Sequence, residues 1–232
     1  MKISIVIPTY NEEKYLAKTL KSIMNQTLKP DEVIIADYKS KDKTREIAKS
    51  FNCKIVDVDK EGIGYGRAKG VEKAKGDIIV LASADAVYDK NWLYNLTKPI
   101  IEGKVCSTVG SIYIENPNLI EKVGGFILNK CLIPIAFLIG FVFASGDSIA
   151  IKRSVYDKVG GIRDMQTGED TDLIKRVKRI CKVAFVENAR TFTSNRRIRK
   201  WGWLKYTVFH TINFFKVNLL NSSFNKYEAV RE

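Results

Sequence analysis

Four short segments of the chain carry polar, glycine and carboxylate residues in places where a ligand could bind. They are Pro8–Glu12, Asp37–Asp42, the glycine-rich stretch Gly62–Gly70, and Ser83–Asp85. Each lies directly after an apolar segment or directly before a helical pattern. Carboxylates at such positions can hold a metal ion or bind the base and ribose hydroxyls of a nucleotide. The alternative is that these aspartates only cap helices or form turns, which Asp favours.

The elements that must position these segments alternate between strand and helix. Strands are predicted at Ile3–Ile7, Glu32–Ala36, Cys53–Val58 and Asp77–Ala82. Helices are predicted at about Glu12–Gln26, with Asn11 as its cap, at about Lys41–Phe51 and at about Gly66–Ala74. This order predicts a mostly parallel sheet covered by helices, in which ligands bind at the carboxyl ends of the strands. All four segments would then meet at one edge of the sheet.

Composition restricts the class of protein. The chain has 232 residues, of which 45% are hydrophobic and 28% charged, which is typical of a folded globular protein. Its four cysteines (Cys53, Cys106, Cys131 and Cys181) include no CxxC pair, which argues against a zinc site or a disulfide framework. We therefore expect core-filling cysteines and a reducing compartment. The start MKISIVIPTYNEE becomes polar too early for a secretory signal, so we expect a cytoplasmic protein.

Positive charge is concentrated in the last third of the chain. The whole chain has a net charge of +13. Eleven Lys/Arg residues and one acid, Glu187, lie between Leu173 and Lys205. Such a segment attracts phosphates of a nucleic acid, an anionic membrane or a charged substrate, or forms only a solvated helix face. Stacking of single-stranded nucleic acid on Trp201 and Trp203 is a possible use. It would leave the first 100 residues without a role, so we predict no nucleic-acid partner.

At these segments the sequence resembles the family 2 glycosyltransferases, which have the nucleotide-sugar-binding GT-A fold. Five stretches match in order: IVIPTYNEE, DEVIIADYKSKDKT (Asp31–Thr44), GRAKGVEKAKGDIIVLASAD (Gly66–Asp85), SGDSIAIKRSVYDKVGGIRD (Ser145–Asp164) and GEDTDLIKRV (Gly168–Val177). The resemblance implies an α/β GT-A fold with one catalytic domain over 1–195. Residues 1–115 would be its nucleotide-sugar half and 116–195 its acceptor half. A basic, aromatic helical tail would follow over 196–232.

The resemblance also assigns roles to residues. The donor nucleotide would be bound by Pro8, Tyr10, Glu12, Asp37, Arg67, Ser83 and Ala84. Asp85 matches the position that holds a divalent cation, Mg²⁺ or Mn²⁺, which stabilises a departing diphosphate. Asp170, with Glu169 beside it, matches the catalytic base that deprotonates the acceptor hydroxyl. The alternative for these two acids is that they only favour the start of a helix through its dipole.

The sequence departs from the family pattern at several positions. Tyr38 and Lys39 follow Asp37 where a second aspartate is usual, Ser83-Ala84-Asp85 replaces Asp-x-Asp, and Ala68 replaces a common asparagine. One carboxylate in place of two predicts weaker metal binding. The Gln-x-x-Arg-Trp signature of processive members survives at most as RIRKW, residues 197–201. We therefore expect a single addition of sugar rather than polymerisation.

Two segments indicate a membrane. Residues 131–146 are free of charge but short for a span and broken by Pro134, so a core element and an interfacial segment are both compatible. The tail repeats apolar residues at helical spacing beside basic ones: Trp201, Leu204, Val208, Ile212, Phe215 and Leu219. Such a helix can lie among anionic headgroups, or can pack on the domain or on a second subunit. His210, the only histidine, is expected to pack rather than to catalyse.

Taken together, the sequence predicts an inverting, metal-assisted glycosyltransferase. It would move one sugar from a UDP- or GDP-linked donor to a lipid-linked or glycan acceptor, and would be peripheral on the inner face of the cell membrane. The alternative is a catalytically degenerate GT-A protein that binds nucleotides or acts as a scaffold.

Overall fold

A single eight-stranded sheet runs through the molecule. The computed structural model describes residues 1–224, and its strand order is β3-β2-β1-β4-β7-β6-β8-β5. The first four strands along the chain, β1 (Ile3–Thr9), β2 (Glu32–Asp37), β3 (Lys54–Asp57) and β4 (Ile78–Leu81), are parallel to one another. Their carboxyl ends therefore share one edge, as the strand–helix alternation predicts.

The second half of the sheet is mixed. Strand β7 (Ile149–Lys152) is antiparallel to β4 and to β6 (Ser107–Ile114), whereas β6 and β8 (Val183–Thr193) are parallel. The short edge strand β5 (Ala86–Tyr88) is antiparallel to β8. The mostly parallel sheet expected from the sequence is thus a mixed sheet with a parallel first half. Because β6 joins β7 and β8, the sheet is continuous across both predicted halves of the domain, and their division at residue 115 stays a prediction.

Alternate side chains of the strands enter two separate cores, as the period-2 geometry of a strand requires. Ile5 and Ile35 pack with one layer of helices, α1 (Leu16–Met24), α2 (Thr44–Ser50) and α4 (Trp92–Ile101). Val6 and Ile34 pack with the other layer, α3 (Ile63–Glu72), α7 (Arg153–Lys158) and α8 (Glu169–Lys178). The sheet is therefore buried between two helical layers.

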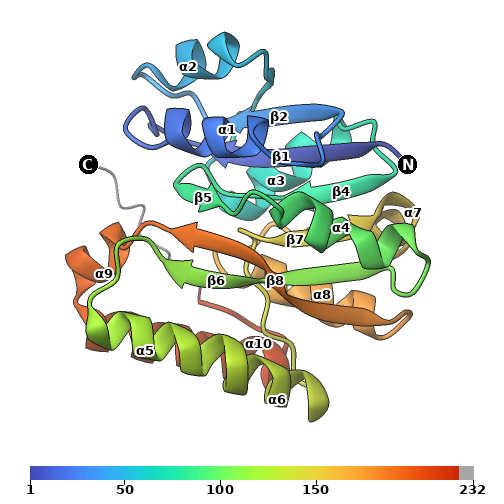
Figure 1. The fold of residues 1–232 in the computed structure, drawn as a ribbon, viewed down its shortest axis with the longest axis vertical. Coiled ribbons are helices and arrows are strands. Elements are labelled where there is room, and N and C mark those ends of the chain that lie inside the picture. Colours follow the sequence, from blue (N-terminus) through green and yellow to red (C-terminus); the bar gives the residue numbers. More distant parts are fainter. Residues whose placement is uncertain (225–232) are drawn as a thin grey trace.

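The remaining helices gather at the β8 end of the molecule (Figure 1). Helix α5 (Leu119–Ile127) begins with a capping box between Asn118 and Glu121 and continues through a π-helical turn, η1 (Leu128–Leu132), into α6 (Ile133–Leu138). After β8 come α9 (Arg196–Trp201) and α10 (Trp203–Leu220). Within residues 1–224, none of the helices has the length and apolar character that a membrane crossing requires. The predicted tail ends at residue 232, and its last eight residues lie outside the described part.

One local prediction is wrong, at the start of the first helix. Asn11 does not cap a helix: its backbone φ is 53°, its Oδ1 accepts a hydrogen bond from Lys41 N at 2.9 Å, and α1 begins only at Leu16. The asparagine instead ties the end of β1 to the segment after β2. The other elements of the first half agree with the prediction to within about three residues at each end.

Two of the cysteines that were expected to fill the core pair with each other instead. Cys106 and Cys181 form a disulfide, with their Cα atoms 6.4 Å apart. They are 75 residues apart in sequence, and the pairing of β6 with β8 brings them together, since Cys106 N donates to Lys182 O at 3.1 Å. Cys131 is exposed rather than a core filler, whereas Cys53 packs at the edge of the core.

Candidate active site

The ends of β1 and β2 form one wall of the candidate site. Asp37 is buried, and its carboxylate accepts hydrogen bonds from Thr9 Oγ1 at 2.9 Å and Ser40 Oγ at 2.6 Å. The rings of Tyr10 and Tyr38 lie 5.2 Å apart, centroid to centroid, directly after these strands. Tyr38, which departs from the family pattern, therefore adds an aromatic surface beside the predicted donor residues.

A second group joins helices α3 and α8. Arg67 on α3 is 2% exposed and forms an ion pair with Glu169 at the start of α8. Its Nε is one of two buried side-chain polar atoms in residues 1–224 that have no hydrogen-bond partner. An orphaned, buried guanidinium nitrogen costs free energy unless a ligand satisfies it. Pro8 lies next to this helix, since a Cβ added at Gly66 would be 3.5 Å from Pro8 Cβ.

Asp170 is held by the loop that precedes β7. Its Oδ2 accepts a hydrogen bond from Gly146 N at 2.8 Å and its Oδ1 one from Thr171 N at 2.6 Å. A Cβ added at Gly146 would lie 2.0 Å from Arg67 Nη1. Glycine at this position therefore lets the loop close over both Arg67 and Asp170.

The two adjacent carboxyl groups are poised to hold a proton. Burial and the charge of Asp170 raise the pKa of Glu169 to about 7, although Arg67 pulls it down. Burial also raises the pKa of Asp170, against the charge of Arg67 and the hydrogen bond from Gly146. Carboxyl groups with raised pKa values in a cleft are typical of acid–base chemistry. Helix capping alone does not require this burial.

Asp85, in the short turn between β4 and β5, faces an arginine. Arg196 Nη2 lies 2.9 Å from Asp85 Oδ2, and the two guanidinium nitrogens of Arg196 lie 2.8 Å from the two oxygens of Glu12. Burial raises the pKa of Asp85 to about 6, although the charge of Arg196 lowers it. Glu12, predicted to bind the nucleotide, thus serves here as a bidentate partner of Arg196.

A second carboxylate lies close to Asp85. Ser83 Oγ donates a hydrogen bond to Asp147 Oδ1, and the charge of Asp147 contributes to the raised pKa of Asp85. Ala84, which lies between Ser83 and Asp85 in the sequence, is buried, and its carbonyl accepts a hydrogen bond from Thr19 Oγ1 at 2.7 Å. Hard oxygen donors of this kind suit Mg²⁺ or Mn²⁺. Across residues 1–224 no group of three or more His, Cys, Asp or Glu could hold a metal, so donor phosphates would have to complete the coordination.

Sequence reasoning missed the roles of two residues in this cluster. Arg196 was visible only as one member of a basic run, because its partner Glu12 lies 184 residues away. Asp147 lies in the SGD segment that matches the family, a signal that could have identified it. His210 is half-buried beside Tyr206, with ring centroids 4.4 Å apart, and burial lowers its pKa to about 4. It packs as a neutral side chain, in agreement with the prediction.

The tail helix lies against the start of α8. Gly168, at φ 74°, precedes Glu169, and a Cβ there would be 2.8 Å from Val217 Cγ2 of α10. Lys175 Nζ on α8 donates to the carbonyl of Val217 at 2.9 Å. Helix α10 therefore packs on the helix that carries the predicted base.

Comparison with known proteins points to one family. The family model for glycosyl transferase family 2 matches residues 4–160. The chain is 27% identical over 223 residues to the O-antigen chain rhamnosyltransferase RfbN of Salmonella typhimurium, covering 87% of this chain and 70% of that protein. It is 30% identical over 216 residues to a dolichyl N-acetyl-alpha-D-glucosaminyl phosphate glucuronosyltransferase of Methanococcus voltae, covering 88% of this chain and 64% of that protein.

Solved structures share the fold. Staphylococcus aureus TarS 1–349 in complex with UDP-GlcNAc has a TM-score of 0.65 at 19% identity, with 84% of this chain and 58% of that chain covered. Glucosyl-3-phosphoglycerate synthase from Mycobacterium tuberculosis, crystallised with Mn²⁺, UDP and phosphoglyceric acid, has a TM-score of 0.67 at 20% identity. That match covers 91% of this chain and 77% of that chain. The α/β architecture and its curled mixed sheet are therefore those of these enzymes.

Proposed function

The chain belongs to the family 2 glycosyltransferases, and from this premise we propose that it transfers one sugar from a nucleoside-diphosphate sugar, with inversion, to a lipid-linked or glycan acceptor. The observation that carries the proposal is the group formed by the buried Arg67 and Glu169 with the half-buried Asp170, closed by Gly146. The carboxylate that we propose as the base belongs to this group, together with a guanidinium whose Nε has no hydrogen-bond partner. Such a pairing suits a reaction in which an anionic donor meets a hydroxyl.

The donor is proposed to lie along the carboxyl ends of β1, β2 and β4. The Tyr10–Tyr38 aromatic pair and the buried Asp37 carboxylate would bind the base of UDP or GDP, with Pro8 as part of the same wall. Arg67, Ser83 and Ala84 would line the path towards the diphosphate. The UDP complexes of TarS and of the mycobacterial synthase support this placement by analogy of fold.

A divalent cation is proposed at Asp85. Asp85 and Asp147 would supply carboxylate oxygens, and Ser83 a hydroxyl oxygen. A bound cation would neutralise charge that develops on the departing diphosphate. Mn²⁺ in the crystals of the mycobacterial synthase supports a cation requirement, with Mg²⁺ as the other candidate.

Asp170 is proposed as the base. It would take the proton from the acceptor hydroxyl as that oxygen forms a bond to the anomeric carbon and the bond to the diphosphate breaks on the opposite face. Glu169 would keep Arg67 in place through their ion pair, and its pKa, like that of Asp170, is raised by burial. An already ionised phosphate acceptor would need no base, and Asp170 would then only orient it.

The names of two relatives suggest the class of acceptor. The dolichyl phosphate named for the Methanococcus voltae relative favours a lipid-linked acceptor, and RfbN favours a surface glycan. The chain spans 64% of the former's length, so the activity of the whole protein is part of the proposal. We place it on the cytoplasmic face of the cell membrane, as a peripheral protein.

The experiment that tests this proposal is a transfer assay with a panel of UDP- and GDP-sugars and membrane-lipid extract as acceptor, read by mass spectrometry. We expect one donor to give one added sugar per acceptor, with little product from Asp85→Ala or Asp170→Asn. No transfer from any donor, with the nucleotide still bound, would instead support a degenerate GT-A scaffold. The pairing of Arg196 with Asp85 is the observation that favours this second candidate.

A further inference from the structure

Exposed hydrophobic side chains are concentrated at one end of the molecule. Of the twenty large hydrophobic residues exposed within residues 1–224, sixteen lie on two stretches. Nine are in residues 119–139 and seven are on α10, with Leu138 at 85%, Leu119 at 77% and Leu204 at 70% the most exposed. We call these sixteen side chains the end surface. Single exposed apolar residues are ordinary, but a contiguous patch marks an interaction site.

The loop that follows α6 joins the two stretches. Asn218 on α10 donates to the carbonyl of Val142 at 3.0 Å and accepts from its N–H at 2.9 Å. The ring of Phe141 lies 5.9 Å from that of Phe214 and 6.4 Å from that of Phe215, centroid to centroid. Helix α6 is therefore fastened to α10 through this loop, and Figure 1 draws α5, α6 and α10 at the same end of the molecule.

The charge around this surface has one sign. Residues 197–220 contain no acid and five bases: Arg197, Arg199, Lys200, Lys205 and Lys216. Residues 119–139 contain one acid, Glu121, and two bases, Lys122 and Lys130. Apolar side chains bordered by cations are complementary to a bilayer that carries anionic headgroups.

We propose that the end surface binds an anionic lipid bilayer, with α5–α6 and α10 lying in the headgroup region. The cations that border this surface favour an anionic bilayer over a second copy of the chain, because two copies that each carry a net charge of +13 repel one another. The 18 residues of α10 do not qualify as a span, so it lies on the membrane rather than across it.

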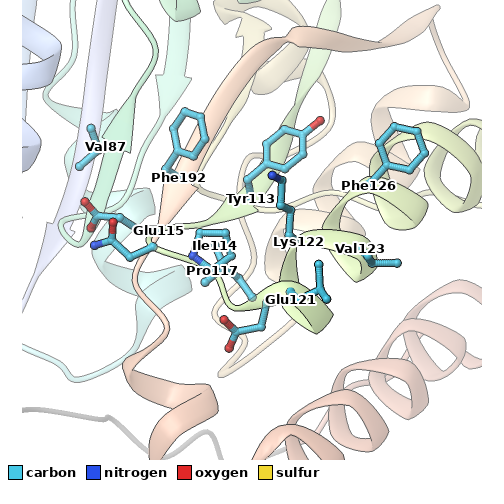
Figure 2. Close-up of a pocket in the computed structure, with 12 residues that line it drawn as sticks. Val87, Tyr113, Ile114, Glu115, Pro117, Glu121, Lys122, Val123, Phe126 and Phe192 are labelled. Atoms are coloured by element: carbon cyan, nitrogen blue, oxygen red, sulfur yellow. The ribbon is translucent and has the colours of Figure 1, made fainter.

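A groove lies beside this surface, between α5 and the strands β5, β6 and β8, with a volume of about 740 Å³. Figure 2 shows Phe126 of α5 at one side of it and Val87 of β5 at the other. Its lining is mainly apolar, with Tyr113 and Phe192 on the sheet side. A hydrocarbon chain in this groove would lie against β5, the strand that begins directly after Asp85.

This inference rests on the proposed function for the identity of the acceptor, but its test needs no sugar transfer. Flotation with vesicles of phosphatidylglycerol and phosphatidylcholine, compared with phosphatidylcholine alone, measures the bound fraction. We expect binding to the anionic vesicles, at least a tenfold lower affinity for Leu138→Glu and for Leu204→Glu, and weaker binding in high salt. Ile101→Glu on α4, where the side chain is 48% exposed away from this surface, is the matched control and should bind normally.

Three results would overturn the inference: no flotation of the wild type, flotation of both variants equal to that of the wild type, or a defect in the Ile101→Glu control as large as that of the two variants. Light scattering tests the alternative that a second copy of the chain covers this surface. That alternative predicts a dimer that Leu204→Glu dissociates, and no binding to vesicles. Thermal melts of the variants show that they are folded. Vesicle binding without transfer would overturn only the proposed function, and transfer to a soluble acceptor without vesicle binding only this inference.

Discussion

Arg196 Nη2 lies 2.9 Å from Asp85 Oδ2, so the carboxylate predicted to hold a metal already faces a cation of the chain itself. The same guanidinium binds Glu12 through both of its nitrogens, and Arg196 is only 7% exposed. The contact ties α9 to the ends of β1 and β4. A divalent ion must share Asp85 with this arginine or displace it, which makes Arg196 central to both stability and metal use.

Replacing Arg196 should destabilise the fold. Arg196→Met leaves Glu12 and Asp85 buried without a counter-charge, which typically costs about 3–5 kcal/mol of unfolding free energy. Urea denaturation measures this loss. Arg199→Met, an exposed arginine on the same helix, should change the unfolding free energy by less than about 0.5 kcal/mol. A loss in Arg196→Met no larger than in the control would contradict the ion-pair assignment.

Gly146 should tolerate no side chain. Gly146→Ala places a Cβ where the Arg67 guanidinium lies, so either the loop or Arg67 must move. We expect a loss of about 1–3 kcal/mol in unfolding free energy, as for other overpacked sites, together with weaker donor binding.

Gly124→Ala on α5 is the control for that substitution, because nothing lies within 4 Å of its added Cβ. It should stabilise the helix by up to about 1 kcal/mol. Thermal melts of the two variants under one set of conditions distinguish the sites, and equal melting temperatures would show that the loop does not close on Arg67.

Glu169 should make stability depend on pH. Because the pKa of Glu169 rises from an ordinary 4.5 to about 7 in the folded protein, the folded state holds a proton that the unfolded state has lost between these values. The unfolding free energy therefore falls as pH rises from about 4.5 to 7, by roughly 3 kcal/mol. Glu169→Gln should flatten this slope, measured by urea denaturation at pH 5, 6, 7 and 8. Glu72→Gln, at an exposed acid, should keep it.

Asp170→Asn should separate chemistry from binding. With a hydroxyl acceptor, we expect the transfer rate to fall about 10²–10⁴-fold, because the amide cannot accept the proton. The affinity for the nucleotide should change little. Asp157→Asn on α7, at an exposed acid, provides the comparison. Full transfer by Asp170→Asn to a hydroxyl acceptor would remove Asp170 from the role of base.

The parts of the fold that sequence predicts are those with strong local signals. The β-branched run Ile3–Ile7 and the segments ending at Asp37 and Leu81 read as buried strands, and their parallel order brings Pro8, Asp37 and Asp85 to one edge. The alternation of strands and helices is what predicts this shared edge. The positions of the predicted donor residues could therefore be predicted from the sequence, while their roles stay predictions.

The remaining features depend on partners far apart in the sequence. Nothing near Arg196 indicates Glu12, and nothing near Cys106 indicates Cys181, because both pairings exist only after β8 has joined the sheet. Asn11 has the sequence of a helix cap, but its side chain accepts from Lys41 N instead. Tertiary hydrogen bonds overrode the local preference there. Helix α5 was missed although Asn118 and Glu121 have the spacing of a capping box, a signal that could have predicted its start.

The central claim, a nucleotide-sugar site built around Asp85, is tested most directly by calorimetric titration with UDP and with GDP, each with and without Mn²⁺. The account predicts that one nucleotide binds in the presence of Mn²⁺, and that Asp85→Ala abolishes this binding while Asp157→Ala retains it. Failure of both nucleotides to bind, or equal binding by Asp85→Ala, would contradict it.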